Sequence, residues 1–195
     1  MARISSVCVY CGSSFGRDSR HRDDALRLGH ALATAGITLV YGGGGVGLMG
    51  TLAKACLNAG GKVVGILPSF LMREEKGLAG LSELEIVDSM HERKERMFAL
   101  ADAFVVLPGG LGTLDETFEV LTWKQLGLHK KSIVLVDAGG YWQRLRALIQ
   151  HLVDEGFAPE SAQSFFHAVP TIEAALDYLL AQAAAPADAA VGKRL

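Results

Sequence analysis

Short apolar runs rich in Val and Ile recur along this chain, and longer segments with helical periodicity separate them. The runs are continuous rather than alternating, which is typical of strands buried on both faces of a sheet. A chain with this order of elements is expected to form a parallel sheet with helices on both faces. The predicted strands are 7–10, 37–41, 62–67, 103–107, 132–136 and, on a weaker pattern, 84–87.

Six segments have the periodicity of amphipathic helices. The segment 24–35 places Ala25, Leu28 and Leu32 on one stripe, and Gly36 follows as a helix terminator. The other predicted helices are 48–59, 91–101, 114–126, 141–155 and 171–185. We therefore predict an α/β fold, a Rossmann-like doubly wound parallel sheet, as a single domain over residues 1–182. The alanine-rich tail 183–195 is expected to be disordered.

The composition argues against several classes of partner. With 19 basic and 21 acidic residues, the formal net charge is −2, which lacks the basic excess typical of nucleic-acid binding. We find no signal region near the N-terminus and no run of the ~18 apolar residues that a membrane span needs. We expect a cytoplasmic protein without membrane or nucleic-acid partners. An odd number of cysteines, three, favours structural thiols over disulfides. Cys8 is assigned to a strand and Cys11 to the loop after it, rather than to a redox or zinc site.

A first glycine-rich loop, residues 42–50, joins a predicted strand to a predicted helix. Glycine lets a ligand approach the backbone, and a helix N-terminus offers N–H groups and the positive end of a dipole. The loop also matches the dinucleotide fingerprint, but the next strand ends at Leu67 and Pro68, without the acidic residue that would hold a ribose. We therefore predict a phosphate cradle, with Gly43 and Gly44 in contact with the substrate.

A second glycine-rich loop, residues 108–113, again separates a strand from a helix and is expected to face the same crevice. An interpretation without a ligand is also open, because Thr113 and Glu116 have the spacing of a helix capping box. Glu119 is not used by that box. Glu116 and Glu119 share one helix side with Trp123, where two carboxylates can polarise a water, stabilise a cationic sugar or form a solvated edge.

Two cations stand on the apolar stripe of the predicted helix 91–101. Arg93 and Lys94 share that stripe with Met97, although burying two unpaired cations costs several kcal/mol. They must reach water or meet an anion, which can be a structural acid such as Glu116 or a phosphate. The glycine loops independently predict an anion and favour the phosphate.

Taken together, these motifs resemble the Lonely Guy family of cytokinin riboside 5′-monophosphate phosphoribohydrolases, some of whose relatives have been labelled lysine decarboxylases. The matching segments are 7–14, 41–44, 90–94, 108–116 with the pattern P-G-G-x-G-T-x-x-E, 122–123 and 155–157. They extend over nearly the whole chain except the tail.

The resemblance implies a role for each matching residue. Arg93 and Glu116 correspond to the catalytic pair, and Glu75, in the irregular segment 67–81, corresponds to a substrate-binding acid. The implied nucleotide contacts are Lys94, Gly110, Gly112, Thr113 and Thr122. The resemblance also implies a homodimer, a nucleoside 5′-monophosphate substrate, and no metal or organic cofactor.

The implied reaction is hydrolysis of the bond between the base and C1′ of a ribose 5-phosphate. Breaking this bond builds positive charge on the ribose, and a nearby carboxylate stabilises that charge or activates water. We assign this role to Glu116, with Glu119 in support. Arg93 is expected to orient the substrate, because its pKa is too high for a proton donor.

Two other functions remain open from the sequence, and a third is disfavoured. An AMP nucleosidase of purine salvage differs only in whether the base pocket admits a prenyl group, which no motif reports. A non-catalytic protein that binds a nucleotide or the molybdenum cofactor shares the fold and the glycine motif. A decarboxylase needs a lysine that forms a Schiff base with pyridoxal phosphate, and no motif positions one.

Overall fold

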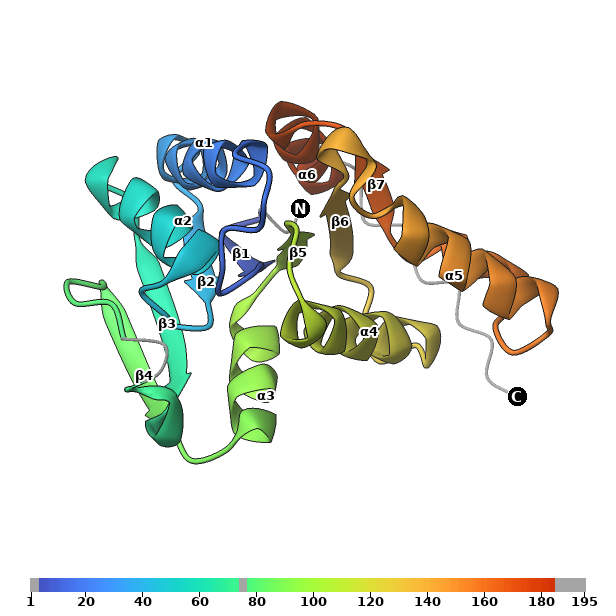
Figure 1. Cartoon of the computed structure of the whole chain (residues 1–195), viewed down its shortest axis with the longest axis horizontal. Helices are drawn as coiled ribbons and strands as arrows, with labels where there is room; N and C mark the ends of the chain where they lie inside the picture. The colour runs from blue at the N-terminus through green and yellow to red at the C-terminus, as the bar shows by residue number, and fades with distance from the viewer. Residues whose placement is uncertain (1–3, 74–76, 185–195) are drawn as a thin grey trace.

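The computed structural model describes residues 4–73 and 77–184 of the 195-residue chain. Its strands form a seven-stranded sheet in the order β4-β3-β2-β1-β5-β6-β7, and each neighbouring pair runs parallel (Figure 1). The strands are β1 Ser6–Tyr10, β2 Thr38–Tyr41, β3 Val63–Pro68, β4 Glu83–Val87, β5 Ala103–Val106, β6 Ser132–Val136 and β7 His167–Val169. The predicted parallel α/β fold is confirmed.

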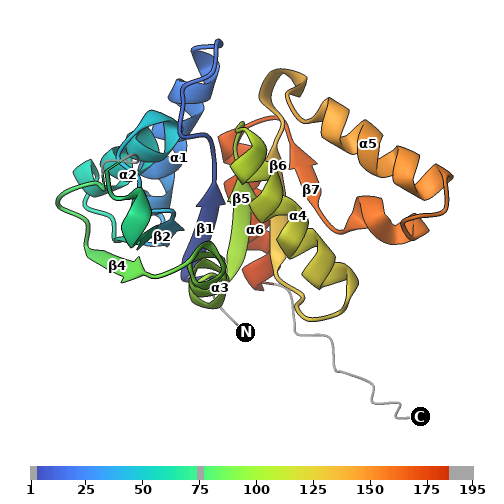
Figure 2. The same ribbon diagram turned by 60° about the horizontal axis from the view of Figure 1, so that its bottom comes forward.

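The helices cover both faces of the sheet (Figure 2). One apolar cluster packs Leu28, Leu52 and Leu179, from α1, α2 and α6, against one face, and a second cluster involves α3, α4 and α5 on the other. The helices are α1 Arg20–Thr34, α2 Gly47–Asn58, α3 Met90–Leu100, α4 Leu111–Gln125, α5 Gln143–Asp154 and α6 Ile172–Ala184. Short 3-10 turns occupy Ser69–Leu71 (η1), Ala138–Gly140 (η2) and Glu160–Ser164 (η3).

The six predicted strands are confirmed, but β7 was not predicted. It has only three residues and begins with the exposed His167, so the sequence pattern is too short to show a strand. The strand forms because it pairs with β6, where Leu135 lies opposite Ala168, and not because of its own sequence pattern. At the C-terminus α6 extends to Ala184, and the rest of the predicted tail, 185–195, lies outside the described residues.

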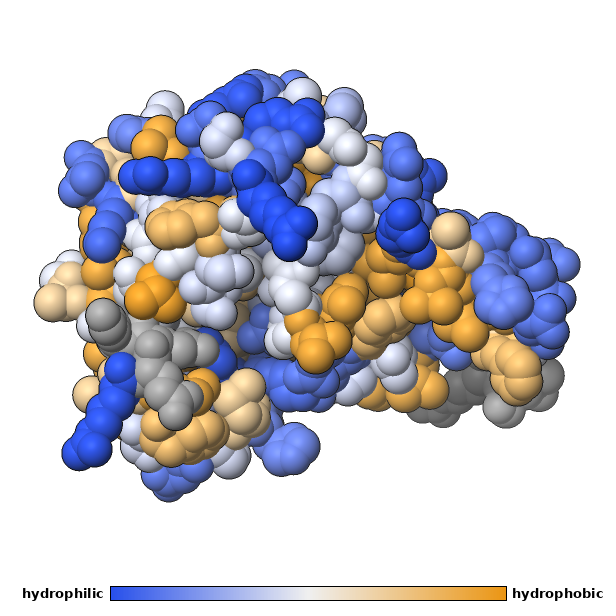
Figure 3. Space-filling view, viewed as in Figure 1, coloured by the Kyte–Doolittle hydropathy of each residue, from blue (hydrophilic) through white to orange (hydrophobic). Residues whose placement is uncertain are grey.

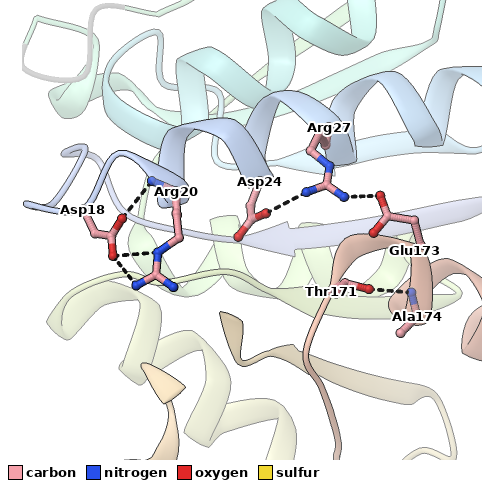
Figure 4. A network of polar contacts seen from close by, with 7 residues as sticks. All are labelled: Asp18, Arg20, Asp24, Arg27, Thr171, Glu173 and Ala174. Carbon is pink, nitrogen blue, oxygen red and sulfur yellow. Dashed lines mark hydrogen bonds and ion pairs between the residues drawn. The ribbon is translucent and has the colours of Figure 1, made fainter. Parts of the chain in front are cut away.

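Charged residues link α1 to α6, which are far apart in sequence (Figure 4). Arg27 lies 3.7 Å from the carboxylate of Asp24 and also forms an ion pair with Glu173 at the start of α6. The turn before α1 is ordered by Asp18, which accepts hydrogen bonds from the backbone N–H and the guanidinium of Arg20. These bonds explain why α1 begins at Arg20, four residues before the predicted start.

The central strand β1 determines where a ligand site forms. Its neighbours are β2 on one side and β5 on the other, so the chain winds away from β1 in both directions. In such sheets the loops at the carboxyl ends of the strands diverge at this switch point and leave a crevice. The loops after β1 and β5 therefore flank the candidate site. Within the described residues, no helix is long and apolar enough to cross a membrane.

Candidate active site

A pocket of ≈ 260 Å³ lies at the switch point. The loop after β1, the start of α4 and one side of α3 form its walls. The lining residues are Cys11, Gly12, Ser13, Met49, Leu71, Met90, Arg93, Gly110, Leu111, Gly112, Thr113, Asp115 and Glu116. The fold thus brings together five residues that the sequence singled out: Arg93, Gly110, Gly112, Thr113 and Glu116.

The start of α4 corrects the expected capping box. The helix begins at Leu111, its N-cap is Gly110, and no side chain caps it. Thr113 lies inside the first turn, and its side chain fills the space where a Cβ atom of residue 109 would stand. Because glycine at this position leaves that space, the chain enters the helix three residues before the predicted start. The N–H groups of the first turn therefore face the pocket without a side-chain partner, which is the arrangement that binds anions.

A capping arrangement is found instead at α3. Ser89 accepts a hydrogen bond from the N–H of Glu92 (3.1 Å), and the Glu92 carboxylate accepts one from the N–H of Asp88 (2.9 Å). This reciprocal pair resembles a capping box and determines where α3 begins. One consequence is that Arg93 points toward the sheet, as predicted, and is only 4% exposed.

The Arg93 guanidinium is held by backbone oxygens at the ends of two strands. Its Nε donates to the carbonyl of Ile66 (3.2 Å) and its Nη2 to that of Gly42 (2.7 Å). The Nη1 atom lies 3.9 Å from the sulfur of Met90. Because both carbonyls belong to the rigid edge of the sheet, the guanidinium keeps a fixed position and orientation beside the pocket.

Lys94 pairs with two acids of α4. Its Nζ lies 3.1 Å from Asp115 and 3.1 Å from Glu119, and its side chain is 11% exposed. Burial lowers the pKa of Lys94, but the hydrogen bonds to Asp115 and Glu119 outweigh it and leave the pKa above its usual value. The pairing with a structural acid, one of the two open interpretations, is thus present for Lys94. Its contact with a nucleotide stays a prediction.

The Glu116 carboxylate acts electrostatically on the end of β1. Burial, and then the charge of Glu116, raises the pKa of both Cys8 and Cys11. These buried thiols stay protonated at neutral pH, which fits structural cysteines rather than nucleophiles. Among the described residues, no group of three or more His, Cys, Asp and Glu side chains is arranged to hold a metal ion.

The first glycine loop differs from the expected open cradle. At the start of α2, the N–H groups of Leu48 and Met49 donate to the carbonyl of Gly12, at 3.1 and 3.4 Å. Backbone from the loop after β1 thus occupies donors that were expected to face a phosphate. Gly43 accepts a hydrogen bond from the N–H of Leu78 (3.2 Å). Contact of Gly43 and Gly44 with the substrate stays a prediction.

One other predicted site residue lies elsewhere, and another cannot be placed because it falls outside the described part of the chain. Thr122 is exposed and borders a pocket with Phe118 and Phe157, about 15 Å along α4 from Gly112 at 1.5 Å per residue. Glu75 lies outside the described residues. Conversely, Gly12 and Ser13 line the pocket although they were not predicted site residues, because their place beside the central strand follows only from the strand order.

Comparisons with known proteins agree with the motif pattern. A family model described as "possible lysine decarboxylase" matches residues 49–179. A cytokinin riboside 5′-monophosphate phosphoribohydrolase of Oryza sativa subsp. japonica is 44% identical over 170 residues, which are 87% of this chain and 70% of that protein. The chain belongs to the Lonely Guy family. A second relative in this family, from Rhodococcoides fascians and of the same name, is 46% identical over 172 residues, 88% of this chain and 87% of that protein.

The Lonely Guy chain also shares its fold with solved structures of lower identity. The molybdenum cofactor carrier protein of Chlamydomonas reinhardtii superposes with a TM-score of 0.68 at 22% identity, over 92% of this chain and 99% of that one. The two proteins share the same doubly wound sheet, and a shared fold does not by itself determine function, which depends on the site.

Proposed function

We propose that this protein hydrolyses the N-glycosidic bond of cytokinin riboside 5′-monophosphates, and of AMP, to give the free base and ribose 5-phosphate. One observation carries the proposal: the uncapped start of α4 lies in the same pocket as Arg93 and Glu116. An anion site beside a carboxylate is what cleavage of a phosphorylated nucleoside needs. The two relatives named above support the choice of substrate.

In this proposal the 5′-phosphate binds at the first turn of α4. The N–H groups of Leu111 and Gly112 and the positive end of the helix dipole favour a dianion there. Binding energy from the phosphate, which does not react, then positions C1′.

Glu116 follows one turn later and lines the same pocket. As the bond from C1′ to the base nitrogen breaks, positive charge develops on the ribose, and the Glu116 carboxylate stabilises it. A water oxygen forms the new bond to C1′ and gives up a proton, which Glu116 accepts. The departing base takes up a proton from solvent, and Glu116 then returns its own proton to solvent. Arg93, held by carbonyl oxygens of the sheet edge, orients the substrate through hydrogen bonds.

The test is to incubate the protein separately with AMP and isopentenyl-AMP and to measure free base and ribose 5-phosphate by chromatography. Wild-type protein is expected to release both products, and Glu116→Gln to lose at least about 100-fold in rate. Glu95→Gln, an exposed change on α3, is the matched control. The ratio of the two rates decides between cytokinin activation and AMP salvage. Binding without release from either nucleotide would refute the proposal and favour a non-catalytic binding protein.

The family description raises lysine decarboxylation as another candidate, and the state of Lys94 argues against it. A Schiff base with pyridoxal phosphate forms from a neutral amine. Lys94 lies beside the pocket but is held as a cation by Asp115 and Glu119, which keep its pKa above the usual value despite burial. The chemistry of this lysine therefore fits an electrostatic role.

We also propose that the protein forms a homodimer through the face between α4 and α5. Apolar side chains gather over these helices (Figure 3). They line a pocket of ≈ 610 Å³ that contains Leu114, Phe118, Leu145 and Leu148. An apolar face of this kind on a soluble domain fits an association surface.

A further inference from the structure

We propose that Tyr141 is a positioning residue that fixes the orientation of the phosphate-binding loop. The inference rests on the proposed function and extends it to a residue outside the motifs of the sequence analysis. The observation behind it is one hydrogen bond: the hydroxyl of Tyr141 donates to the carbonyl oxygen of Gly109 across 2.7 Å. Gly109 directly precedes Gly110, the N-cap of α4.

A rigid turn after β6 holds the Tyr141 ring in place. Gly139 and Gly140, with φ of +67° and +79°, adopt the left-handed conformation that glycine tolerates. Asp137 then accepts a hydrogen bond from the N–H of Trp142 at 2.6 Å. The Tyr141 ring contacts the buried Trp142 edge to face, with centroids 4.8 Å apart. These contacts restrict its rotamer and aim the hydroxyl at the loop.

A second aromatic contact comes from α1. The ring of His21 meets that of Tyr141 at 5.4 Å, with the planes 76° apart. Both side chains line a pocket of ≈ 390 Å³ that adjoins the catalytic pocket, because Gly12 and Gly110 border both. Tyr141 therefore contacts the loop from one of these adjoining pockets, and Glu116 lines the other.

The hydrogen bond sets the direction of a peptide unit. The carbonyl of Gly109 and the N–H of Gly110 belong to the same planar trans peptide, so they point in opposite directions. With the carbonyl drawn toward Tyr141, the N–H of Gly110 points away from it, and Gly110 lines the pocket that contains Arg93 and Glu116. There it adds one donor to those of the first turn of α4.

Thr113 and Gly12 pack closely against Gly109, whereas the next glycine of the loop has free space around it and can adopt a wide range of backbone angles. A Cβ atom at Gly110 or Gly112 would meet nothing within 4 Å, so both residues stand in open space. The N–H of Gly12 holds the carbonyl of Pro108 at 3.1 Å, which anchors the loop one residue before Gly109. The hydrogen bond from Tyr141 therefore fixes the orientation of the peptide between Gly109 and Gly110. This orientation determines whether the Gly110 N–H is available to a ligand.

The test is Tyr141→Phe, which keeps the ring and removes the hydroxyl. Calorimetry with ribose 5-phosphate is expected to show affinity lower by about five- to tenfold, as for one hydrogen bond, while affinity for adenine is unchanged. The KM for AMP is expected to rise by a similar factor with kcat within about twofold of wild type. Tyr178→Phe, in α6, is the matched control, because the ring of Tyr178 stacks on His167 of β7, away from the pocket.

Unchanged ribose 5-phosphate affinity in Tyr141→Phe, or equal loss for adenine, would overturn the inference. Equal thermal stability of the two tyrosine variants would show that a changed affinity does not come from unfolding. Calorimetry measures binding without turnover. The role of Tyr141 and the proposed function can therefore be refuted independently of each other. Wild-type protein that binds ribose 5-phosphate but releases no base refutes the proposed function, and wild-type protein that binds none overturns the role of Tyr141.

Discussion

Arg93 and Gly42 are joined across 51 positions of sequence by a 2.7 Å hydrogen bond from the guanidinium to the backbone carbonyl. The contact is possible only because residue 42 has no side chain, since a Cβ atom there would overlap Nη2 of Arg93. Glycine at position 42, directly after β2, is therefore required for the buried Arg93 side chain to occupy its position.

Gly42→Ala is therefore expected to displace Arg93 and to lower kcat/KM by about 100-fold, as a misplacement near 1 Å does. Gly29→Ala, within α1 where that helix packs on α2, is the matched control because its added Cβ atom would also meet an occupied space, there the backbone of Leu52, but far from the pocket. The control is expected to lose about 1–3 kcal/mol of stability and to keep its kcat/KM. Wild-type kcat/KM in Gly42→Ala would contradict this account of Arg93.

Lys94→Met removes the cation between Asp115 and Glu119 and leaves two carboxylates in proximity. The pair is partly buried, so the free energy of unfolding is expected to fall by about 1–2 kcal/mol in urea denaturation. Adding Asp115→Asn and Glu119→Gln is expected to restore stability. If Lys94 also contacts the nucleotide, as predicted, KM stays raised in the triple variant, and a return of KM to the wild-type value would reject that contact.

Asp102 links the start of β1 to the end of α3, and its effect should depend on pH. Burial raises the pKa of Asp102, but hydrogen bonds from the backbone and hydroxyl groups of Ser5 and Ser6 outweigh it, so the pKa lies below the usual 3.8. A depressed folded-state pKa stabilises the protein above pH 3.8, and this contribution is lost as the pH falls through the folded-state value.

Asp102→Asn is therefore expected to cost about 1 kcal/mol at pH 7 and progressively less below pH 3.8, with exposure limiting the size of the effect. Urea midpoints measured at pH 7 and in acid give the comparison. Asp177→Asn, on the exposed side of α6, is the control and should show no such convergence. A constant difference across this range would contradict the linkage argument.

Phe157 follows α5, is 83% exposed and borders an apolar pocket with Phe118 and Leu121 of α4, which places it at the face proposed for the dimer. Phe157→Asp is expected to shift the proposed dimer toward monomer in size-exclusion chromatography with light scattering. Leu26→Asp, at a 45% exposed site on α1, is the control and should leave the mass unchanged. A wild-type monomer at micromolar concentration would reject the dimer.

The sheet was predictable because its strands are buried on both faces. Residues such as Val105 and Val134 have no exposed surface, so the sequence shows unbroken apolar runs. The buried position of Arg93 was also visible, as a charge on an apolar stripe. These features are local, and the periodicity of the sequence records them directly.

Other features depend on contacts between distant segments. The spacing of Thr113 and Glu116 predicted a cap, but the space left by Gly109 lets Thr113 sit inside α4. The first glycine loop predicted free donors, and only the folded chain shows Gly12 occupying them. The local sequence indicates which backbone N–H groups a loop contains. Only the tertiary structure shows which of them are free to bind a ligand.

The backbone of Gly12 connects three loops at once. Its N–H holds Pro108 after β5, and its carbonyl receives Leu48 and Met49 at the start of α2. Loops joined in this way are already ordered when a ligand arrives, so the entropy lost in arranging them belongs to folding rather than to binding. The loops are therefore expected to have the same conformation in the free protein and in its complex. Small phosphorylated fragments should bind without a slow rearrangement.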